Sequence, residues 1–122
     1  EIGGKGIIAD WIYICDFDHV FADIDRPITE QGIVKSPVRI GPDVWIGTKV
    51  SVLRGTTVGH GCVLAANSVV RGNVPPMSVM GGVPARLLKD RVGEYRAAEQ
   101  QRIDVADIAR KTAKAAKEHA GR

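Results

Sequence analysis

One histidine stands in an acidic segment and has the chemistry of a general base. His19 follows Asp16 and Asp18, and Asp23 and Arg26 come a few residues later. An imidazole with a pKa of about 6.5 can accept a proton from a hydroxyl group at neutral pH. The segment could therefore assist attack of a hydroxyl on an ester or thioester. The alternative interpretation is an ordinary histidine of an exposed loop.

The charged neighbours of His19 are candidate substrate ligands. We predict that Asp16, Asp18, Asp23 and Arg26 contact a polar substrate. Asp16 or Asp18 could instead hold the imidazole ring of His19, as could a backbone carbonyl. All of these aspartates could also serve only to form turns, since Asp favours loops.

A metal centre is not predicted. Zinc held by histidines needs three of them around one ion, and the other two histidines, His60 and His119, are not placed to join His19. The cysteines, Cys15 and Cys62, form no CxxC pair. We expect Cys62 to be a buried free thiol.

The element that must position these side chains is a repeat of six residues. Aliphatic residues recur at this interval, namely Ile40, Ile46, Val52, Val58, Leu64 and Val70. The position four residues after each is small or β-branched, namely Val44, Val50, Thr56, Cys62, Ser68 and Val74. A period of six predicts a parallel β-helix in which each hexad forms one side of a prism.

Three hexads make one coil of eighteen residues, so side chains eighteen positions apart should stack. Ile40 is expected on Val58, Ile46 on Leu64, and Val52 on Val70. Each buried aliphatic side chain contributes about 1.5–3 kcal/mol.

A loop at about residues 16–33 interrupts the repeat, which also occupies residues 2–14. We predict that the repeat restarts at Val34 and continues unbroken to Val74. Pro75 and Pro76 should end the coils because proline cannot donate a ladder hydrogen bond. Residues 77–84 should then leave the prism. Because the chain opens within the repeat, we also expect that N-terminal coils are missing.

Two domains follow from these boundaries. Residues 1–84 form the β-helix, with the loop at 16–33 inserted, and residues 85–122 form a basic extension that is helical at about 89–118. The extension holds ten of the seventeen Lys and Arg residues but six of the fourteen acidic ones. We interpret it as a solvated helix rather than a surface for nucleic acid or membrane. Without an apolar run of membrane-spanning length or a signal peptide, we expect a soluble cytoplasmic protein with no membrane insertion.

The chain resembles the hexapeptide-repeat acyltransferases, among them the maltose, galactoside and nodulation-factor O-acetyltransferases and those that decorate polysaccharides. The segments that carry the resemblance arrive in the order and spacing of that family, namely CDFDH (15–19), PVRIG (37–41), VWIG (44–47), NSVV (67–70), VPP (74–76) and GVPAR (82–86). The resemblance covers about residues 2–90. It implies an all-β, left-handed parallel β-helix with a C-terminal α-helical extension. It also implies a homotrimer, with acetyl-CoA bound between neighbouring prisms.

Site residues follow from the same resemblance. His19 corresponds to the catalytic base, Trp45 would line the acyl channel, and the backbone amide near Gly47 and Thr48 would stabilise the oxyanion. The residues that would bind coenzyme A are Trp45, Gly47, Thr48, Ala65, Ala66, Arg71, Arg86 and Lys89. The arginines suit phosphate because the guanidinium matches two phosphate oxygens.

The resemblance therefore implies an acetyl-CoA-dependent O-acetyltransferase acting on a carbohydrate-like hydroxyl, with no metal and no nucleic acid. One alternative is a trimeric β-helix scaffold without activity, because a fold does not guarantee a function. Another alternative on the same scaffold is a zinc enzyme of the γ-carbonic-anhydrase type. It is not favoured, because this chain lacks the three suitably placed histidines that such a zinc site needs.

Overall fold

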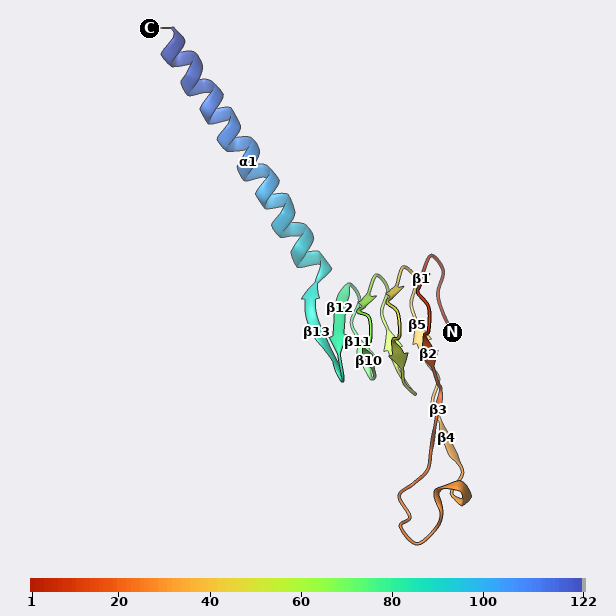
Figure 1. Ribbon diagram of the computed structural model, residues 1–122. Helices are drawn as coiled ribbons and strands as arrows, with labels where there is room; N and C mark the ends of the chain where they lie inside the picture. Colours follow the sequence, from red (N-terminus) through yellow and green to blue (C-terminus); the bar gives the residue numbers. More distant parts are fainter. Residues whose placement is uncertain (122) are drawn as a thin grey trace. The chain divides into compact units, whose positions relative to one another are not determined.

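Short strands at six-residue intervals form three parallel sheets in residues 1–90. The computed structural model describes residues 1–121. Each strand of a sheet pairs with the strand one coil away (Figure 1). The first sheet contains β1 (Ile7–Ile8), β6 (Trp45–Ile46), β9 (Val63–Leu64) and β12 (Ser78–Gly82). The second contains β2 (Tyr13–Ile14), β7 (Ser51–Val52) and β10 (Val69–Val70), and the third β5 (Arg39–Ile40), β8 (Thr57–Val58) and β11 (Asn73–Val74).

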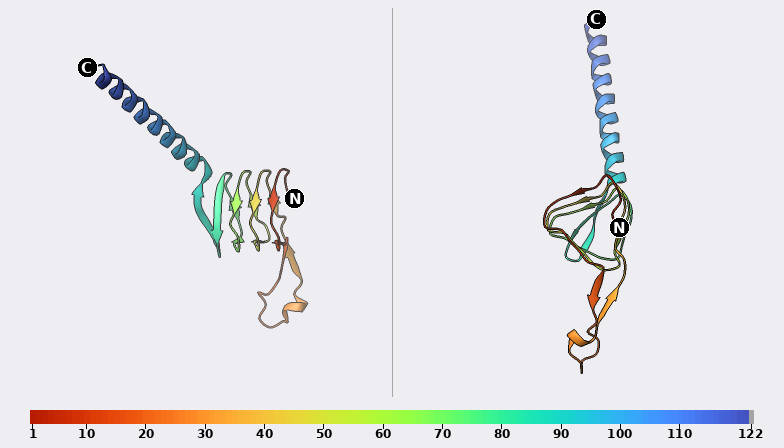
Figure 2. Two further views of the ribbon diagram at one scale, coloured as in Figure 1. Left: turned by 45° about the horizontal axis from the view of Figure 1, so that its top comes forward. Right: turned by 90° about the vertical axis from the view of Figure 1, so that its right-hand side faces the viewer.

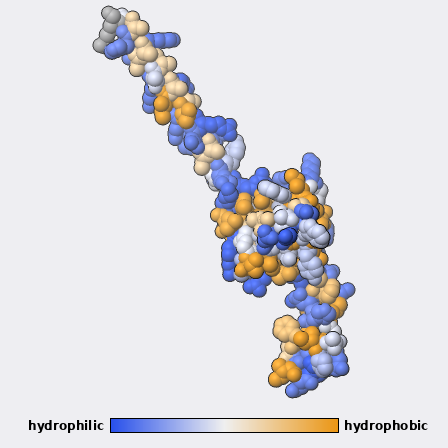
Figure 3. Space-filling model, in the orientation of Figure 1, coloured by the Kyte–Doolittle hydropathy of each residue, from blue (hydrophilic) through white to orange (hydrophobic). Residues whose placement is uncertain are grey.

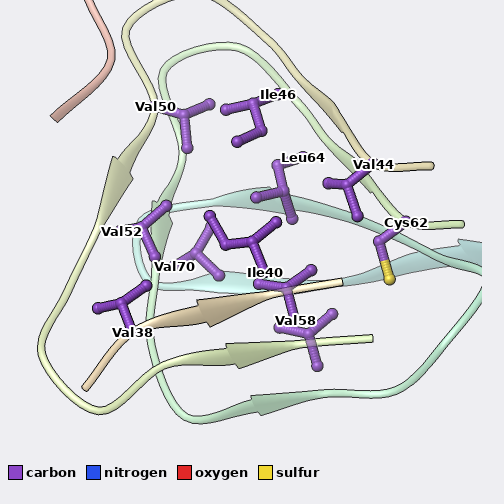
Figure 4. Packing of buried hydrophobic residues seen from close by; sticks show 11 residues of the cluster. Val38, Ile40, Val44, Ile46, Val50, Val52, Val58, Cys62, Leu64 and Val70 are labelled. Carbon is purple, nitrogen blue, oxygen red and sulfur yellow. The ribbon is translucent and has the colours of Figure 1, made fainter. Parts of the chain in front are cut away.

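The stacking of side chains eighteen positions apart is confirmed. Ile40 pairs with Val58, Ile46 with Leu64, and Val52 with Val70. The second residue of each two-residue strand from β5 to β11 points inward, and these side chains fill the prism (Figure 4). The small positions of the repeat are buried as well, from Val44 to Ser68. Seen along the axis, the coils superimpose (Figure 2, right).

Close stacking of the coils explains the glycines that follow three inward residues. A Cβ on Gly41, Gly47 or Gly59 would lie 2.9, 2.7 or 2.6 Å from a backbone nitrogen of the next coil. These glycines are therefore needed for close approach and not for a left-handed conformation. The corners of the prism use the left-handed region at Asp43, Lys49, Gly55, Gly61 and Asn67, which are again six apart. Asp and Asn tolerate this region better than most residues.

The interrupting segment is an antiparallel hairpin. Its strands are β3 (Phe17–His19) and β4 (Ile33–Lys35), and a short 3₁₀ helix, η1 (Ile28–Glu30), lies near its tip. Ile14 of β2 pairs with Val52, which lies thirty-eight positions later in the chain. One coil accounts for eighteen of these positions, and the inserted hairpin accounts for the other twenty. The hairpin leaves the prism in Figure 1, and hydrophobic side chains lie on its surface in Figure 3.

The predicted restart of the repeat at Val34 is wrong. Val34 pairs with Asp18 in the hairpin and is 41% exposed. The first buried positions after the hairpin are Val38 and Ile40. Val34 is an aliphatic residue like those that point into the prism, which is why the pattern included it. It pairs instead with the antiparallel strand β3 of the hairpin.

The end of the prism also differs from the expectation. Val74 pairs with Val58, sixteen positions earlier, so the last coil is two residues shorter and Val74 occupies an inward aliphatic position. The chain does not leave the prism after Pro76, because β12 still pairs in parallel with β9. A further strand, β13 (Ala85–Asp90), folds back antiparallel onto β12 and ends the sheet.

The C-terminal unit is one helix, α1 (Arg91–Ala120). Residues 85–90, which we assigned to the extension, form β13 and belong to the first compact unit, Glu1–Asp90. None of the residues of α1 is buried. Within residues 1–121, no helix has both the length and the hydrophobicity that crossing a bilayer requires.

Candidate active site

His19 lies at the end of β3 with its side chain exposed. Its ring meets the ring of Phe17 edge to face, with centroids 6.0 Å apart. Residues two apart on a strand share a face, so both rings lie on one face of the hairpin. His19 also lines a cavity of about 390 Å³ together with Ile28, Thr29, Gly32 and Ile33. A ligand bound in this cavity would therefore meet the imidazole and two aliphatic side chains.

Asp18 points away from His19 and binds an arginine of the prism. Its Oδ2 accepts a hydrogen bond from Nε of Arg54 at 2.8 Å. Asp16 lies at the base of the hairpin, where its carbonyl accepts from the amide of Ser36 at 2.9 Å. Neither carboxylate has a hydrogen bond to His19 in the described part of the chain. Neither Asp16 nor Asp18 thus holds the imidazole through a direct hydrogen bond.

Asp23 and Arg26 organise the tip of the hairpin. Oδ1 of Asp23 accepts from the Asp25 amide at 3.0 Å, and Nη2 of Arg26 donates to the Glu30 carbonyl at 2.7 Å. The side chain of Gln31 donates to the carbonyls of both Asp23 and Arg26 at 2.8 Å. These charged groups shape the loop, and neither lines the cavity beside His19.

A second cavity, of about 440 Å³, lies on the outer face of the first sheet. It is lined by eight residues, namely Ala9, Trp45, Gly47, Thr48, Val63, Leu64, Ala65 and Ala66. Trp45 of β6 and Val63 of β9 stand opposite each other in register, and both point outward. The small residues Gly47, Ala65 and Ala66 leave the hollow beside them. Five of the eight predicted coenzyme-binding residues therefore come together.

The hydrogen bonds at Gly47 and Thr48 decide which groups beside this cavity could donate to a ligand. The Gly47 N–H donates to the Leu64 carbonyl at 2.8 Å and is part of the sheet, so it cannot serve as the expected oxyanion donor. The Thr48 hydroxyl donates to Asp10, at 2.9 Å from the carboxylate Oδ1 and 3.0 Å from the carbonyl. Asp10 thus fixes the turn at Thr48.

Three predicted basic ligands of coenzyme A lie outside the cavity. Arg71 follows β10 in a different sheet. Arg86 and Lys89 are exposed on β13, opposite Gly81 and Val79. None of the three basic residues lines the hollow beside Trp45.

Asp10 and Arg54 were missed by the sequence analysis. Asp10 precedes Thr48 by thirty-eight positions, and Ile14 precedes its partner Val52 by the same number. The length of the insertion would therefore have predicted that Asp10 lies next to Thr48. No pattern in the sequence singles out Arg54.

Tyr13 lies on β2 close to the base of the hairpin. Its pKa is raised above the ordinary value of 10.0, first by a hydrogen bond with the Cys15 side chain and next by the charge of Cys15. Slight desolvation and the charge of Asp18 act in the same direction. The pKa of the Tyr13 phenol therefore lies above that of an ordinary tyrosine.

Within residues 1–121, no three His, Cys, Asp or Glu side chains are grouped so as to hold a metal ion. The available chemistry beside the two cavities consists of one imidazole, backbone amides, hydroxyls and small apolar surfaces. Such a set suits proton transfer and binding of a partly apolar ligand.

Comparisons with known proteins point to one family. Residues 37–72 match the model described as bacterial transferase hexapeptide (six repeats). A Mycobacterium tuberculosis protein, the probable acetyltransferase Rv3034c, is 56% identical over 117 residues, which is 93% of this chain and 39% of that protein. The putative lipopolysaccharide biosynthesis O-acetyl transferase WbbJ of Escherichia coli is 40% identical over 95 residues, covering 72% of this chain and 48% of WbbJ.

Solved structures agree with this result. A galactoside acetyltransferase in complex with coenzyme A superimposes with a TM-score of 0.67 at 31% identity, over 74% of this chain and 44% of that chain. A maltose O-acetyltransferase from Clostridium difficile gives a TM-score of 0.64 at 34% identity, over 70% of this chain and 45% of that chain. The chain thus spans less than half the length of these relatives. By its repeat, its stacked sheets and these relatives, the chain belongs to the hexapeptide-repeat acetyltransferase family.

Proposed function

We propose that the protein transfers an acetyl group from acetyl-CoA to a hydroxyl of a carbohydrate-like acceptor. One observation carries the proposal: Trp45, Gly47, Thr48, Ala65 and Ala66, which the family resemblance assigns to the coenzyme, line a single cavity. Its volume of about 440 Å³ suits the acyl and pantetheine end of the donor, since ligand pockets hold roughly 300–1,000 Å³. The coenzyme A complex of a galactoside acetyltransferase of similar fold gives further support.

His19 is the proposed general base. Its imidazole accepts the proton of the acceptor hydroxyl as the oxygen attacks the thioester carbonyl, so that a C–O bond forms. The C–S bond then breaks, and the thiol leaves with the proton that His19 returns. The Thr48 N–H is the proposed oxyanion donor, because the Gly47 N–H is already bonded to Leu64. Arg71, Arg86 and Lys89 would bind parts of coenzyme A that extend beyond the cavity.

Assembly would complete the site. The cavity beside His19 and the cavity beside Trp45 share no lining residue. The family resemblance implies a homotrimer of left-handed coils, and we propose that His19 of one copy faces the cavity of a second copy. The acceptor would occupy the cavity beside His19, and Asp16, Asp18, Asp23 and Arg26 would act mainly by shaping the hairpin.

Release of free thiol tests the proposal. The protein is incubated with acetyl-CoA and a panel of galactosides and maltosides, and thiol is followed for the wild type, His19→Ala and His60→Ala. Loss of a general base lowers kcat by about 10²–10⁴-fold, so His19→Ala should be nearly inactive and the exposed His60→Ala should match the wild type. Equal rates for the wild type and His19→Ala would refute the role of His19. No thiol release by the wild type with any acceptor would favour a scaffold without activity.

A further inference from the structure

Arg54 connects the prism to the hairpin that carries His19. Its Nε donates to Oδ2 of Asp18 at 2.8 Å, although the two residues are 36 positions apart. The Arg54 side chain is 34% exposed and that of Asp18 is 55% exposed. We infer that Arg54 is a positioning residue that acts through Asp18 to fix the direction in which His19 faces. This inference rests on the proposed function of His19.

Strand geometry converts the position of Asp18 into the orientation of His19. Phe17, Asp18 and His19 are consecutive in β3, and neighbouring side chains of a strand point to opposite faces. Asp18 takes the face toward Arg54, so His19 must take the other face, where its ring meets that of Phe17. Rotation of β3 about its axis would break the ion pair and turn the imidazole at the same time.

The turn that carries Arg54 also binds the segment that follows β4, the second strand of the hairpin. The Gly55 amide donates to the Ser36 carbonyl at 3.1 Å, and the Ser36 amide donates to the Asp16 carbonyl at 2.9 Å. A Cβ on Gly55 would lie 3.1 Å from Oγ of Ser36, so the two segments are in close contact. Both strands of the hairpin thus contact the turn at residues 53–56, β3 through Asp18 and β4 through the adjoining Ser36.

The turn is itself a rigid support. Thr56 is fully buried, and its hydroxyl donates to the carbonyls of Leu53 at 2.6 Å and Val70 at 3.3 Å. By contrast, every residue of β3 and β4 is exposed, so core packing does not hold the hairpin. Exposed ion pairs contribute little to global stability. The effect of Arg54 is therefore expected in the orientation of the hairpin and not in the melting of the prism.

Four variants test the inference in the full chain. Arg54→Gln and Asp18→Asn break the pair, and Arg54→Asp combined with Asp18→Arg restores it with reversed charges. Arg39→Gln is the matched control, because it removes an arginine whose 3.9 Å contact with Glu1 does not involve the hairpin. The Val20 amide donates to the Gly32 carbonyl at 3.0 Å and the Ser36 amide to the Asp16 carbonyl at 2.9 Å, so hydrogen exchange of these two amides reports hairpin order. Thiol release reports kcat and KM.

We expect faster exchange at Val20 and Ser36 and a fall in kcat of tenfold or more in Arg54→Gln and Asp18→Asn, because a misplacement of about 1 Å can reduce a rate about 10²-fold. The KM for acetyl-CoA and the melting temperature should stay at the wild-type values. The charge-reversed pair should recover both exchange protection and kcat, and Arg39→Gln should match the wild type.

The outcomes separate this inference from the proposed function. Unchanged exchange and kcat in Arg54→Gln, with His19→Ala inactive, would overturn the role of Arg54 and leave the function intact. A loss of kcat matched by a lower melting temperature, without recovery in the charge-reversed pair, would also overturn it. If the wild type releases no thiol, the proposed function fails, and unchanged amide exchange in Arg54→Gln would still reject the contact as an anchor.

Discussion

Polar side chains of the turns and of the hairpin are used mostly to hold backbone in place. Asp10 fixes the turn at Thr48, Asp23 accepts from the amide of Asp25, and Arg26 binds the carbonyl of Glu30. Loops contain few regular backbone pairs, so side chains satisfy the remaining amides and carbonyls. His19 differs because it has a ring contact and an adjoining cavity. Its exposure leaves it available to accept a proton.

The raised pKa of Tyr13 predicts a loss of stability in alkali. The folded state keeps the phenol protonated to a higher pH than the unfolded state, whose pKa is 10.0. The stabilising contribution is therefore complete below pH 10.0 and is lost as the pH rises through the folded-state pKa. In a Tyr95→Phe background only Tyr13 titrates, and its phenolate absorbance should rise at a higher pH than in Cys15→Ala. Identical titration midpoints would show that Cys15 does not raise this pKa.

At the scale of elements, backbone spacing between coils limits which residues the repeat accepts. The Leu64 carbonyl and the Ala66 amide lie 3.0 and 2.7 Å from the position of a Cβ on Gly47. Backbone atoms cannot move aside as a flexible side chain can. The same constraint applies at Gly41 and Gly59, which follow the paired strands β5 and β8.

Gly47→Ala should therefore destabilise the prism, whereas Gly4→Ala should not. Overpacking costs about 1–3 kcal/mol, and a Cβ on Gly4 meets no atom within 4 Å. Urea denaturation of the two variants measures the difference in the free energy of unfolding. Equal urea midpoints for the two variants would mean that neighbouring coils can move apart at Gly47 without a loss of stability.

The repeating part of the fold could be predicted from the sequence, and its irregular parts could not. Period six identified the inward residues from Ile40 to Val70 because each one repeats the same environment. Val34 has the right residue type and the wrong partner, since pairing with β3 depends on a hairpin that leaves the period. The shortened last coil likewise depends on how Val74 pairs with Val58. The Asp18–Arg54 contact joins two residues that no local pattern connects.

At the scale of the whole molecule, the chain consists of two units with different sources of stability. The buried core lies between Val38 and Val74, within the unit Glu1–Asp90. The helix α1 buries none of its residues and carries pairs of its own, such as Lys111 Nζ with Asp107 Oδ2 at 2.9 Å. Pairs of this kind add only about 0.2–0.5 kcal/mol each.

Cleavage between Asp90 and Arg91 should leave the prism folded. A protease site placed there allows the melting temperature to be compared before and after cleavage, and circular dichroism should show loss of the helical signal only. We expect a shift smaller than about 4 °C, which is what 1 kcal/mol produces in a domain of this size. A larger decrease would mean that α1 stabilises the coils.

The hydrogen bond from Ser36 to the carbonyl of Asp16 joins the two points where the chain leaves the prism and returns to it. Because Ile14 stacks on Val52 across this junction, the coils are in register whatever lies between. We therefore expect this position to accept inserted segments of other lengths and compositions while the coils keep their pairing. Under the proposed function, exchange of the hairpin is expected to change which acceptor the protein uses.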